Sequence, residues 1–212
     1  MKTEDLIKAI ATDTSAPAMS MGRAWRVSVT AAVAVAAVVF FAMIGPRPDI
    51  ASAVETVRFL LKPAVAIFLA ASAFVALAAL ARPVAAGSAA IVVLAAAPLL
   101  LLAAVVIEMA VVPPGQWSAR LVGSNAIVCL TYIPLIGFGP LTVFLLALRH
   151  GAPTRPALAG AVAGLLAGGI AATFYAMHCT DDSPLFVATW YTIAVAGLAI
   201  LGALAAPRIA RW

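Results

Sequence analysis

The sequence contains little charge. Of its 212 residues, 10% are Asp, Glu, Lys or Arg and 65% are apolar, and the mean hydropathy is +1.13. A soluble domain is nearer one quarter charged and half apolar. Such a chain cannot hide its apolar surface from water, so we expect lipid to be its solvent. The net charge of +5 is spread over loops and tails without a basic stripe, so we expect no direct contact with nucleic acid.

Cysteine is also scarce, and the sequence lacks the motifs of common enzymes. Its two cysteines, Cys129 and Cys179, are too few for a disulfide scaffold and do not form a C-x-x-C pair, which argues against a thiol oxidoreductase. No Ser–His–Asp set, phosphate loop or metalloprotease helix is present. The first apolar run is too long for a signal peptide, and no cleavage site follows it. We therefore expect a protein that is not an enzyme, with no catalytic residues and no cofactor.

Long apolar stretches are what the sequence does contain. A bilayer core of roughly 30 Å needs about 20 apolar residues per helix, and six stretches qualify. The breaks between them carry Pro, Gly and Asp, which end helices. We predict an all-α polytopic membrane protein with six transmembrane helices, of which the fourth, containing Pro134 and Pro140, is the most irregular. The six stretches are Trp25–Ile44, Phe59–Ala81, Ala89–Val112, Asn125–Leu148, Ala157–Met177 and Leu185–Ala206.

The positions of Lys and Arg predict the orientation. Nine of them flank one side of the six stretches and four flank the other, which places both termini in the cytoplasm by the positive-inside rule. We expect a multi-pass protein of a bacterial inner membrane, with a cytoplasmic segment over residues 1–24, a transmembrane domain over 25–206 and a cytoplasmic tail over 207–212. The nine are Lys2, Lys8, Arg23, Arg26, Arg82, Arg149, Arg155, Arg208 and Arg211, and the four are Arg47, Arg58, Lys62 and Arg120.

A polar island, HCTDDSPLFVATWY, interrupts the apolar sequence at residues 178–191. Cys179 lies in it, just past the outer end of the fifth stretch, and Cys129 lies one turn into the fourth. Counting residues from the short loop between these stretches, at 1.5 Å per residue, leaves a depth mismatch of only ~6–10 Å. Both thiols are therefore predicted near the outer surface and could approach each other, although a disulfide needs Cα atoms within about 7 Å.

Three interpretations of this island stay open. The first is a thiol-reactive or redox sensor formed by Cys129 and Cys179, with His178, Asp181 and Asp182 as neighbours. The second is a soft-metal site formed by Cys129, Cys179 and His178. The third is structural: the aspartates and Ser183 cap the sixth helix, which Pro184 begins.

Some residues elsewhere also have more than one interpretation. Glu108 lies about four residues from the end of the third stretch, where it is either a buried functional acid or reaches the interface. Arg58 and Lys62 begin the second stretch, as interfacial anchors do. Gly160, Gly164 and Gly168 form a small-residue seam, which packs either within the helix bundle or against a second copy.

The N-terminal segment predicts a short amphipathic helix followed by a tether. Such a helix is marginal alone, and it either folds into a groove of a partner or lies on the membrane surface. Its candidate partner-binding residues are Thr3, Glu4, Asp5, Leu6, Ile7 and Ile10.

Five blocks of the sequence together are typical of one protein family: MKTEDLI at residues 1–7, GPRPD at 45–49, WSARLVGSNAIVCL at 117–130, RHGAPTRPALAG at 149–160 and HCTDDSPLFVATWY at 178–191. Through these blocks, and over essentially its whole length, the chain resembles the six-helix integral membrane anti-sigma factors named for the negative regulator of sigma-F. Glu4 stands where we would expect an aspartate.

The resemblance implies a function in transcription regulation. It implies that the chain sequesters an extracytoplasmic-function sigma factor through the N-terminal segment and releases it on envelope stress, with Cys129 and Cys179 taking part in signal perception. Thiol-reactive, heavy-metal or oxidative stress would be sensed at the outer-side cysteines. The alternative function is a small six-helix transporter or channel for a metal ion or small solute, which should have polar residues at mid-membrane depth.

Overall fold

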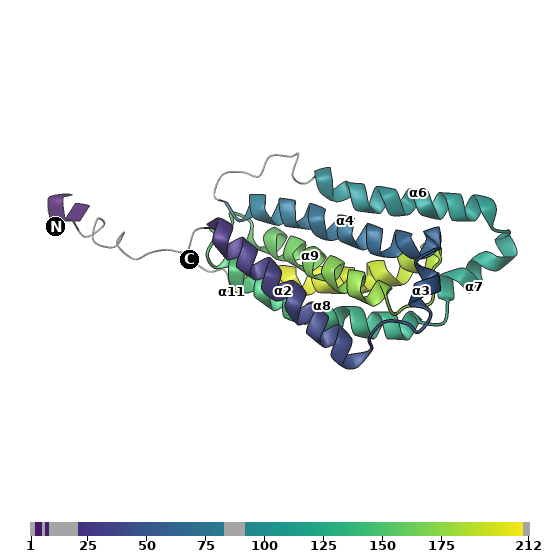
Figure 1. Ribbon diagram of the computed structural model, residues 1–212. Helices are drawn as coiled ribbons and strands as arrows, with labels where there is room; N and C mark the ends of the chain where they lie inside the picture. Colours follow the sequence, from purple (N-terminus) through teal and green to yellow (C-terminus); the bar gives the residue numbers. More distant parts are fainter. Residues whose placement is uncertain (1–2, 6, 9–20, 83–91, 210–212) are drawn as a thin grey trace.

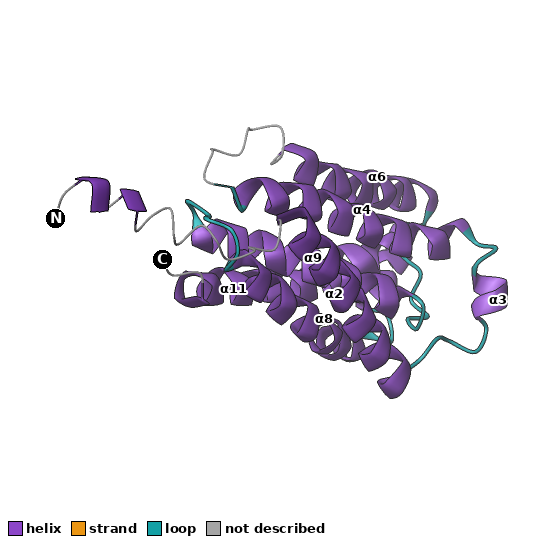
Figure 2. Cartoon of the chain, turned by 60° about the vertical axis from the view of Figure 1, so that its left-hand side comes forward, coloured by secondary structure: helices purple, strands orange, loops and turns teal. Residues whose placement is uncertain are grey.

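The structure is a computed structural model in which residues 3–5, 7–8, 21–82 and 92–209 are described (Figure 1). Within these ranges the regular structure is entirely helical (Figure 2). Six of the helical segments are long and apolar enough to cross a membrane, which agrees with the six predicted stretches. They are α2 (Met21–Met43), α4 (Val57–Leu80), η1 and α6 (Val93–Val111), α8 (Ala126–Leu148), α9 (Pro156–Ala176) and α10–α11 (Pro184–Ile209).

Local sequence signals set several helix boundaries. The helix α4 begins after Thr56, whose side chain accepts a hydrogen bond from the backbone N–H of Phe59 at 3.3 Å. Proline is the first residue of α9 and of α10 (Pro184–Phe186), where its missing N–H removes no helical hydrogen bond. The side chain of Ser183 caps α10 by accepting from the N–H of Leu185, so Ser183 is a helix cap as predicted.

The helix α9 forms the centre of the bundle. Two thirds of its span (67%) is buried, the largest share among the six, and it lies against α4, α8 and α11 (Figure 1). A Cβ atom added to Gly160 would lie 2.1 Å from the carbonyl oxygen of Gly202, and one added to Gly164 would lie 2.3 Å from that of Leu198. Only glycine permits so close an approach of two backbones. The glycine seam therefore packs against α11 (Thr192–Ile209), within the bundle.

The most irregular span is the sixth, and the prediction that it would be the fourth is wrong. The helix α8 continues through Pro134 and Pro140, because each proline removes a single N–H donor while the turns around it stay bonded. In the sixth span, by contrast, η3 (Val187–Tyr191) is a π-helical turn between α10 and α11. π-turns inside α-helices are frequent at functional sites.

Different loops close the two ends of the bundle. At the end where α2 begins and α11 ends, the backbone N–H of Ala152 donates to the carbonyl of Ala81 at 3.0 Å. At the other end, the N–H of Arg47 donates to the carbonyl of Met177 at 3.0 Å. We call the second the cysteine end. It consists of residues 44–56 with α3 (Ile50–Ala53), residues 112–125 with η2 (Pro114–Gln116) and α7 (Trp117–Val122), and the loop 177–183.

The close contact between α9 and α11 gives a first prediction. Gly164→Val should lower the thermal unfolding temperature of the detergent-solubilised protein, because the new side chain would collide with the backbone of α11 at a cost of about 1–3 kcal/mol. Gly197→Val is the control, since an added Cβ there meets no atom within 4 Å. Equal melting temperatures for the two variants would contradict this packing.

Candidate functional site

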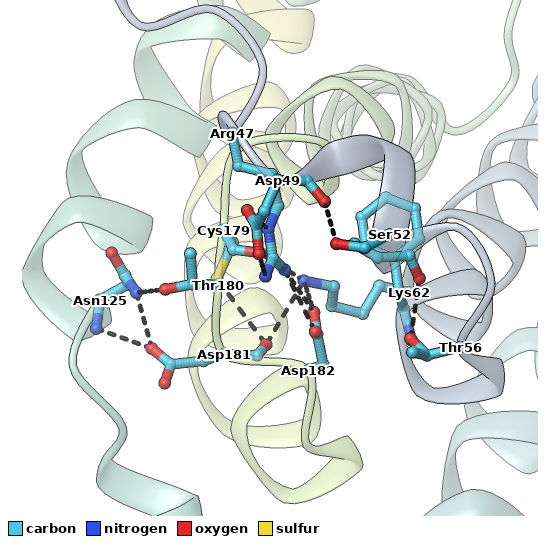
Figure 3. Close-up of polar contacts among 12 residues, drawn as sticks. Arg47, Asp49, Ser52, Thr56, Lys62, Asn125, Cys179, Thr180, Asp181 and Asp182 are labelled. Atoms are coloured by element: carbon cyan, nitrogen blue, oxygen red, sulfur yellow. Dashed lines mark hydrogen bonds and ion pairs between the residues drawn. The ribbon is translucent and has the colours of Figure 1, made fainter.

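The loop 177–183 is the centre of the candidate site. It follows α9, which ends with the N–H groups of His178 and Cys179 both donating to the carbonyl of Tyr175. The loop then contacts α4, the segment after α2 and the start of α8, and Figure 3 shows the polar side chains that make these contacts. The sequence placed the candidate sensing residues here, and the structure shows what surrounds them.

Lys62 makes the most buried of these contacts. It lies in the second turn of α4 with a side chain only 1% exposed, so it is not the interfacial anchor that the sequence predicted. Its Nζ donates to the carbonyl oxygen of Cys179 at 2.7 Å and to that of Asp181 at 3.5 Å, and it pairs with the carboxylate of Asp182. These are three acceptors for three N–H donors, so the buried ammonium is fully bonded. The position of Lys62 near a helix start suggested an anchor. The sequence alone does not show that a loop 117 residues away covers its side chain.

Arg47 binds the same loop from a second direction. Its Nε and Nη2 donate to the two oxygens of the Asp49 carboxylate, both at 2.7 Å. Its Nη1 donates to Asp182 Oδ2 at 3.1 Å. Hydrogen bonding to Asp49 raises the pKa of Arg47 further above its ordinary value and lowers that of Asp49. The residue is 9% exposed. Asp182 therefore joins two cations, one from α4 and one from the loop after α2.

Asp181 fastens the loop to the start of α8. Its Oδ2 accepts from the backbone N–H of Ser124 at 3.0 Å and from that of Asn125 at 2.8 Å, and also from Asn125 Nδ2 (Figure 3). A carboxylate at a helix N-terminus is favourable because it meets free N–H groups and the positive end of the helix dipole. The next turn of α8 contains Cys129, whose N–H donates to the carbonyl of Asn125. Asp181 thus links the loop of one cysteine to the helix of the other.

The two thiols lie inside the protein. Cys129 and Cys179 are both 0% exposed, both are unpaired thiols, and both belong to one cluster of buried residues. Burial raises the pKa of Cys179, with a partial opposing effect of the Lys62 ammonium. The protonated thiol is therefore favoured over the thiolate while Cys179 stays buried.

Two tyrosines complete the surroundings of the thiols. Tyr175 on α9 and Tyr191 at the end of the π-turn have ring centroids 5.6 Å apart, and both belong to the same cluster of buried residues as Cys179. Each hydroxyl is buried, and neither has a hydrogen-bond partner among the described nitrogen and oxygen atoms. Four residues of the site were not predicted from the sequence: Arg47, Lys62, Tyr175 and Tyr191. A lysine inside an apolar run and a tyrosine next to the polar island were the only available signals.

Glu108 forms a second ionic cluster near the loop. It is 4% exposed and accepts from Arg58 at 2.9 Å and from Arg120 at 2.8 Å. The hydroxyl of Ser183 also donates to it, at 3.4 Å. Glu108 is therefore a buried carboxylate whose charge two arginines neutralise, near the end of α6.

The metal interpretation has no assembled ligand set. In the described ranges, no group of three His, Cys, Asp or Glu is arranged to hold a metal ion. His178 faces a different partner, with Nδ1 2.9 Å from the carbonyl oxygen of Gly45. The structure thus brings Cys129, Cys179 and Asp181 into one region and joins Asp182 to two cations.

The N-terminal candidates are described only in part. Thr3, Glu4 and Asp5 are helical and exposed, and Ile7 is helical and 61% exposed. Leu6 and Ile10 lie outside the described residues.

These features define an all-helical bundle with six segments able to cross a membrane and a buried pair of cysteines at one end. A family model described as "Negative regulator of sigma F", NrsF, matches residues 10–212. The chain belongs to this family. It is 30% identical over 218 residues to the anti-sigma-F factor NrsF of Caulobacter vibrioides, and 30% identical over 213 residues to the probable anti-sigma-F factor NrsF of Azospira oryzae. Each match covers 100% of both chains, and no solved structure matches.

The bonding of Lys62 gives a second prediction. Lys62→Met should destabilise the protein by about 3 kcal/mol, because the Cys179 carbonyl loses its shorter hydrogen bond and keeps only the one from Arg47 Nη1 at 3.4 Å, while the Asp182 carboxylate loses one of its two cations. Arg58→Met is the matched control. Arg58 is 45% exposed and Glu108 keeps Arg120, so the expected loss is at most about 1 kcal/mol. Thermal unfolding of both variants in one detergent measures the difference, and a larger loss for Arg58→Met would refute the assignment.

Proposed function

We propose that this chain is a membrane-bound anti-sigma factor of the bacterial inner membrane. It holds an extracytoplasmic-function sigma factor at the cytoplasmic face through its N-terminal segment, and it releases that factor on envelope stress sensed at Cys129 and Cys179. Membership in the NrsF family supports the class of partner. The positive-inside bias supports cytoplasmic termini, with the cysteine end facing out.

The observation that supports sensing is the bonding of the Cys179 backbone. Its carbonyl oxygen accepts a hydrogen bond from Lys62 Nζ at 2.7 Å. Asp181 fastens the loop to the start of α8, and Asp182 pairs with Arg47. A bulky adduct on a fully buried thiol cannot be accommodated without moving that backbone. Modification of Cys179 would therefore loosen several helices at once.

A route to the cytoplasmic face runs along α8. This helix begins at the Asp181 contact and ends at Leu148, next to the loop where Ala152 bonds to Ala81 at the end of α4. A shift of α8 against α9 would therefore move that loop directly, because the loop follows the last residue of α8 in the chain. A coupling of about 1–3 kcal/mol would change sigma-factor affinity roughly 5- to 150-fold.

The transporter alternative has less support. Transporters place ionisable groups at mid-membrane depth. The two buried charged residues inside the described spans, Lys62 and Glu108, both lie within two turns of the cysteine end. Their charges are neutralised there by Asp182 and by two arginines.

Deletion of residues 1–13 tests the capture of the partner. The shortened protein should still fold in detergent, because the segment precedes α2, but it should no longer co-purify with an extracytoplasmic-function sigma factor. A control lacking only Arg211 and Trp212 should retain the sigma factor. Retention by the N-terminal deletion would refute this role of the segment.

Substitution of the cysteines tests sensing. Cys129→Ser and Cys179→Ser should keep sigma-factor capture but lose its release by a thiol-reactive agent, because the reactive sulfur is gone. Release is measured as the fraction of sigma factor that elutes from the immobilised complex after treatment. If both variants release normally, the cysteines are not the sensor.

A further inference from the structure

A groove of about 670 Å³ lies between α2, α4 and α9. Its walls include Val33 of α2, Ile67 and Phe74 of α4, and Ile170 of α9. In Figure 1, α2 crosses α9 obliquely and diverges from α4 toward the cysteine end. At the opposite end of the bundle, α2 contacts α4 through the rings of Trp25 and Phe74, whose centroids are 6.0 Å apart. The groove therefore widens from the start of α2 toward the middle of the bundle.

The interior of this groove is apolar, and small residues leave it open. A Cβ atom added to Gly169 would lie 2.8 Å from the backbone nitrogen of Ala70, so α4 and α9 are in contact beneath the groove. The hydroxyl of Thr173, which lines the groove, donates to the carbonyl of Gly169 at 2.8 Å and so already has a partner. An apolar cavity of about 150 Å³ can hold benzene, so this groove has room for a much longer hydrocarbon chain.

One face of α2 runs along the groove. Arg26, Thr30 and Val33 all line it, and their spacing of four and three residues places them on the same face of the helix. Arg26 and Thr30 are both exposed. From the helical rise, Thr30 lies roughly 6 Å and Val33 roughly 10 Å further along the helix axis than Arg26. The groove thus has a cation at its narrow end, a hydroxyl one turn further and apolar side chains beyond.

The bundle offers Arg26 no carboxylate at its own end. Residues 21–209 contain five carboxylates, and all of them lie at the cysteine end or in the last turn of α6 beside it: Asp49, Glu55, Glu108, Asp181 and Asp182. The opposite end carries six arginines: Arg23, Arg26, Arg82, Arg149, Arg155 and Arg208. An anionic ligand is therefore favoured at the narrow end of the groove.

The occupant that fits is negative at one end and hydrocarbon along the rest. A phosphate can pair with Arg26, an ester carbonyl can accept from the hydroxyl of Thr30, and an acyl chain can lie along Val33 and Ile67. These three groups follow one another in the same order in a phospholipid. A zwitterionic headgroup fits less well, because its ammonium would face the arginines of this end.

We propose that the groove binds an anionic phospholipid, with its phosphate on Arg26 and one acyl chain between α2 and α4. The lipid would hold these two helices together beyond the contact of Trp25 with Phe74. This site goes beyond the proposed function, and only its leaflet rests on that proposal. With the cysteine end facing out, the bound lipid belongs to the cytoplasmic leaflet.

The test compares two lipids with the same acyl chains on the full-length protein in a neutral detergent. Phosphatidylglycerol carries a net negative charge and phosphatidylcholine does not. Native mass spectrometry measures the affinity of each for the first bound lipid. The parent should prefer phosphatidylglycerol about fivefold, as expected for one arginine that meets an anionic headgroup. Equal affinities for the two lipids would overturn the proposal.

Two arginine variants locate the preference. Arg26→Gln should lose it, because the cation that lines the groove is gone. Arg208→Gln is the matched control and should keep it, since Arg208 is an exposed arginine at the same end that lies on α11, outside the groove. Both side chains are exposed, so neither substitution should change the melting temperature without lipid. The same loss of preference in both variants would show general attraction to a basic surface and refute the site.

Two alanine variants test the groove. Ala71→Phe places a ring in the space of the acyl chain and should weaken the binding of both lipids. Ala64→Phe places the same ring at an exposed position of α4 outside the groove and should not. If the two variants bind alike, the acyl chain does not lie in the groove. A dimer peak that only Ala71→Phe removes would assign the groove to a second copy of the chain instead.

These outcomes are separate from those of the proposed function. Sigma-factor capture is tested by the deletion of residues 1–13, which leaves the groove intact. Loss of capture in that deletion together with equal binding of both lipids to the parent would support the proposed function and refute the lipid site.

Discussion

A lysine ammonium inside a helical bundle needs a complete set of acceptors, and the cysteine end is organised around meeting that need. Lys62 binds two carbonyls of the loop 177–183 and the carboxylate of Asp182. Asp182 in turn pairs with Arg47, which Asp49 holds in place. An uncompensated buried charge would cost several kcal/mol, so the loop has little freedom to leave α4. The position of Cys179 follows from this constraint.

The rest of the bundle is held in a different way. Away from the cysteine end, α9 contacts its neighbours through small residues. Gly160 and Gly164 of α9 pack against α11, and Gly169 packs against Ala70 of α4. Helices in lipid gain stability from such close packing because burial against lipid offers no hydrophobic advantage. The protein thus combines a closely packed centre with one ionic end. A chemical change at the cysteine end would disturb the ion pairs and hydrogen bonds of Lys62, Asp182 and Arg47, on which the structure of that end depends.

The candidate site could be predicted in part. The occurrence of Cys129 and Cys179 at the same end of the bundle and the capping role of Ser183 followed from helix rise, loop length and turn chemistry. The burial of Lys62 and Glu108 could not be predicted because their sequence positions, near helix ends, suit interfacial residues as well as buried ones. Their burial depends on segments distant in the chain. The π-turn at Val187–Tyr191 also had no sequence signal, since valine, alanine and threonine are equally compatible with an α-helix.

The sequence by itself determined the number of apolar helices, their approximate bounds and the face on which the small residues of α9 lie. These are properties of local composition and periodicity, and they are easy to recognise in helices long enough to cross a bilayer. Only the tertiary structure decided which charges are paired and which side chains surround the thiols. Arg47 and Asp182 are separated by 135 residues, and Lys62 and Cys179 by 117. Pairing over such distances depends on how six helices pack together, and one sequence contains no local pattern that encodes it.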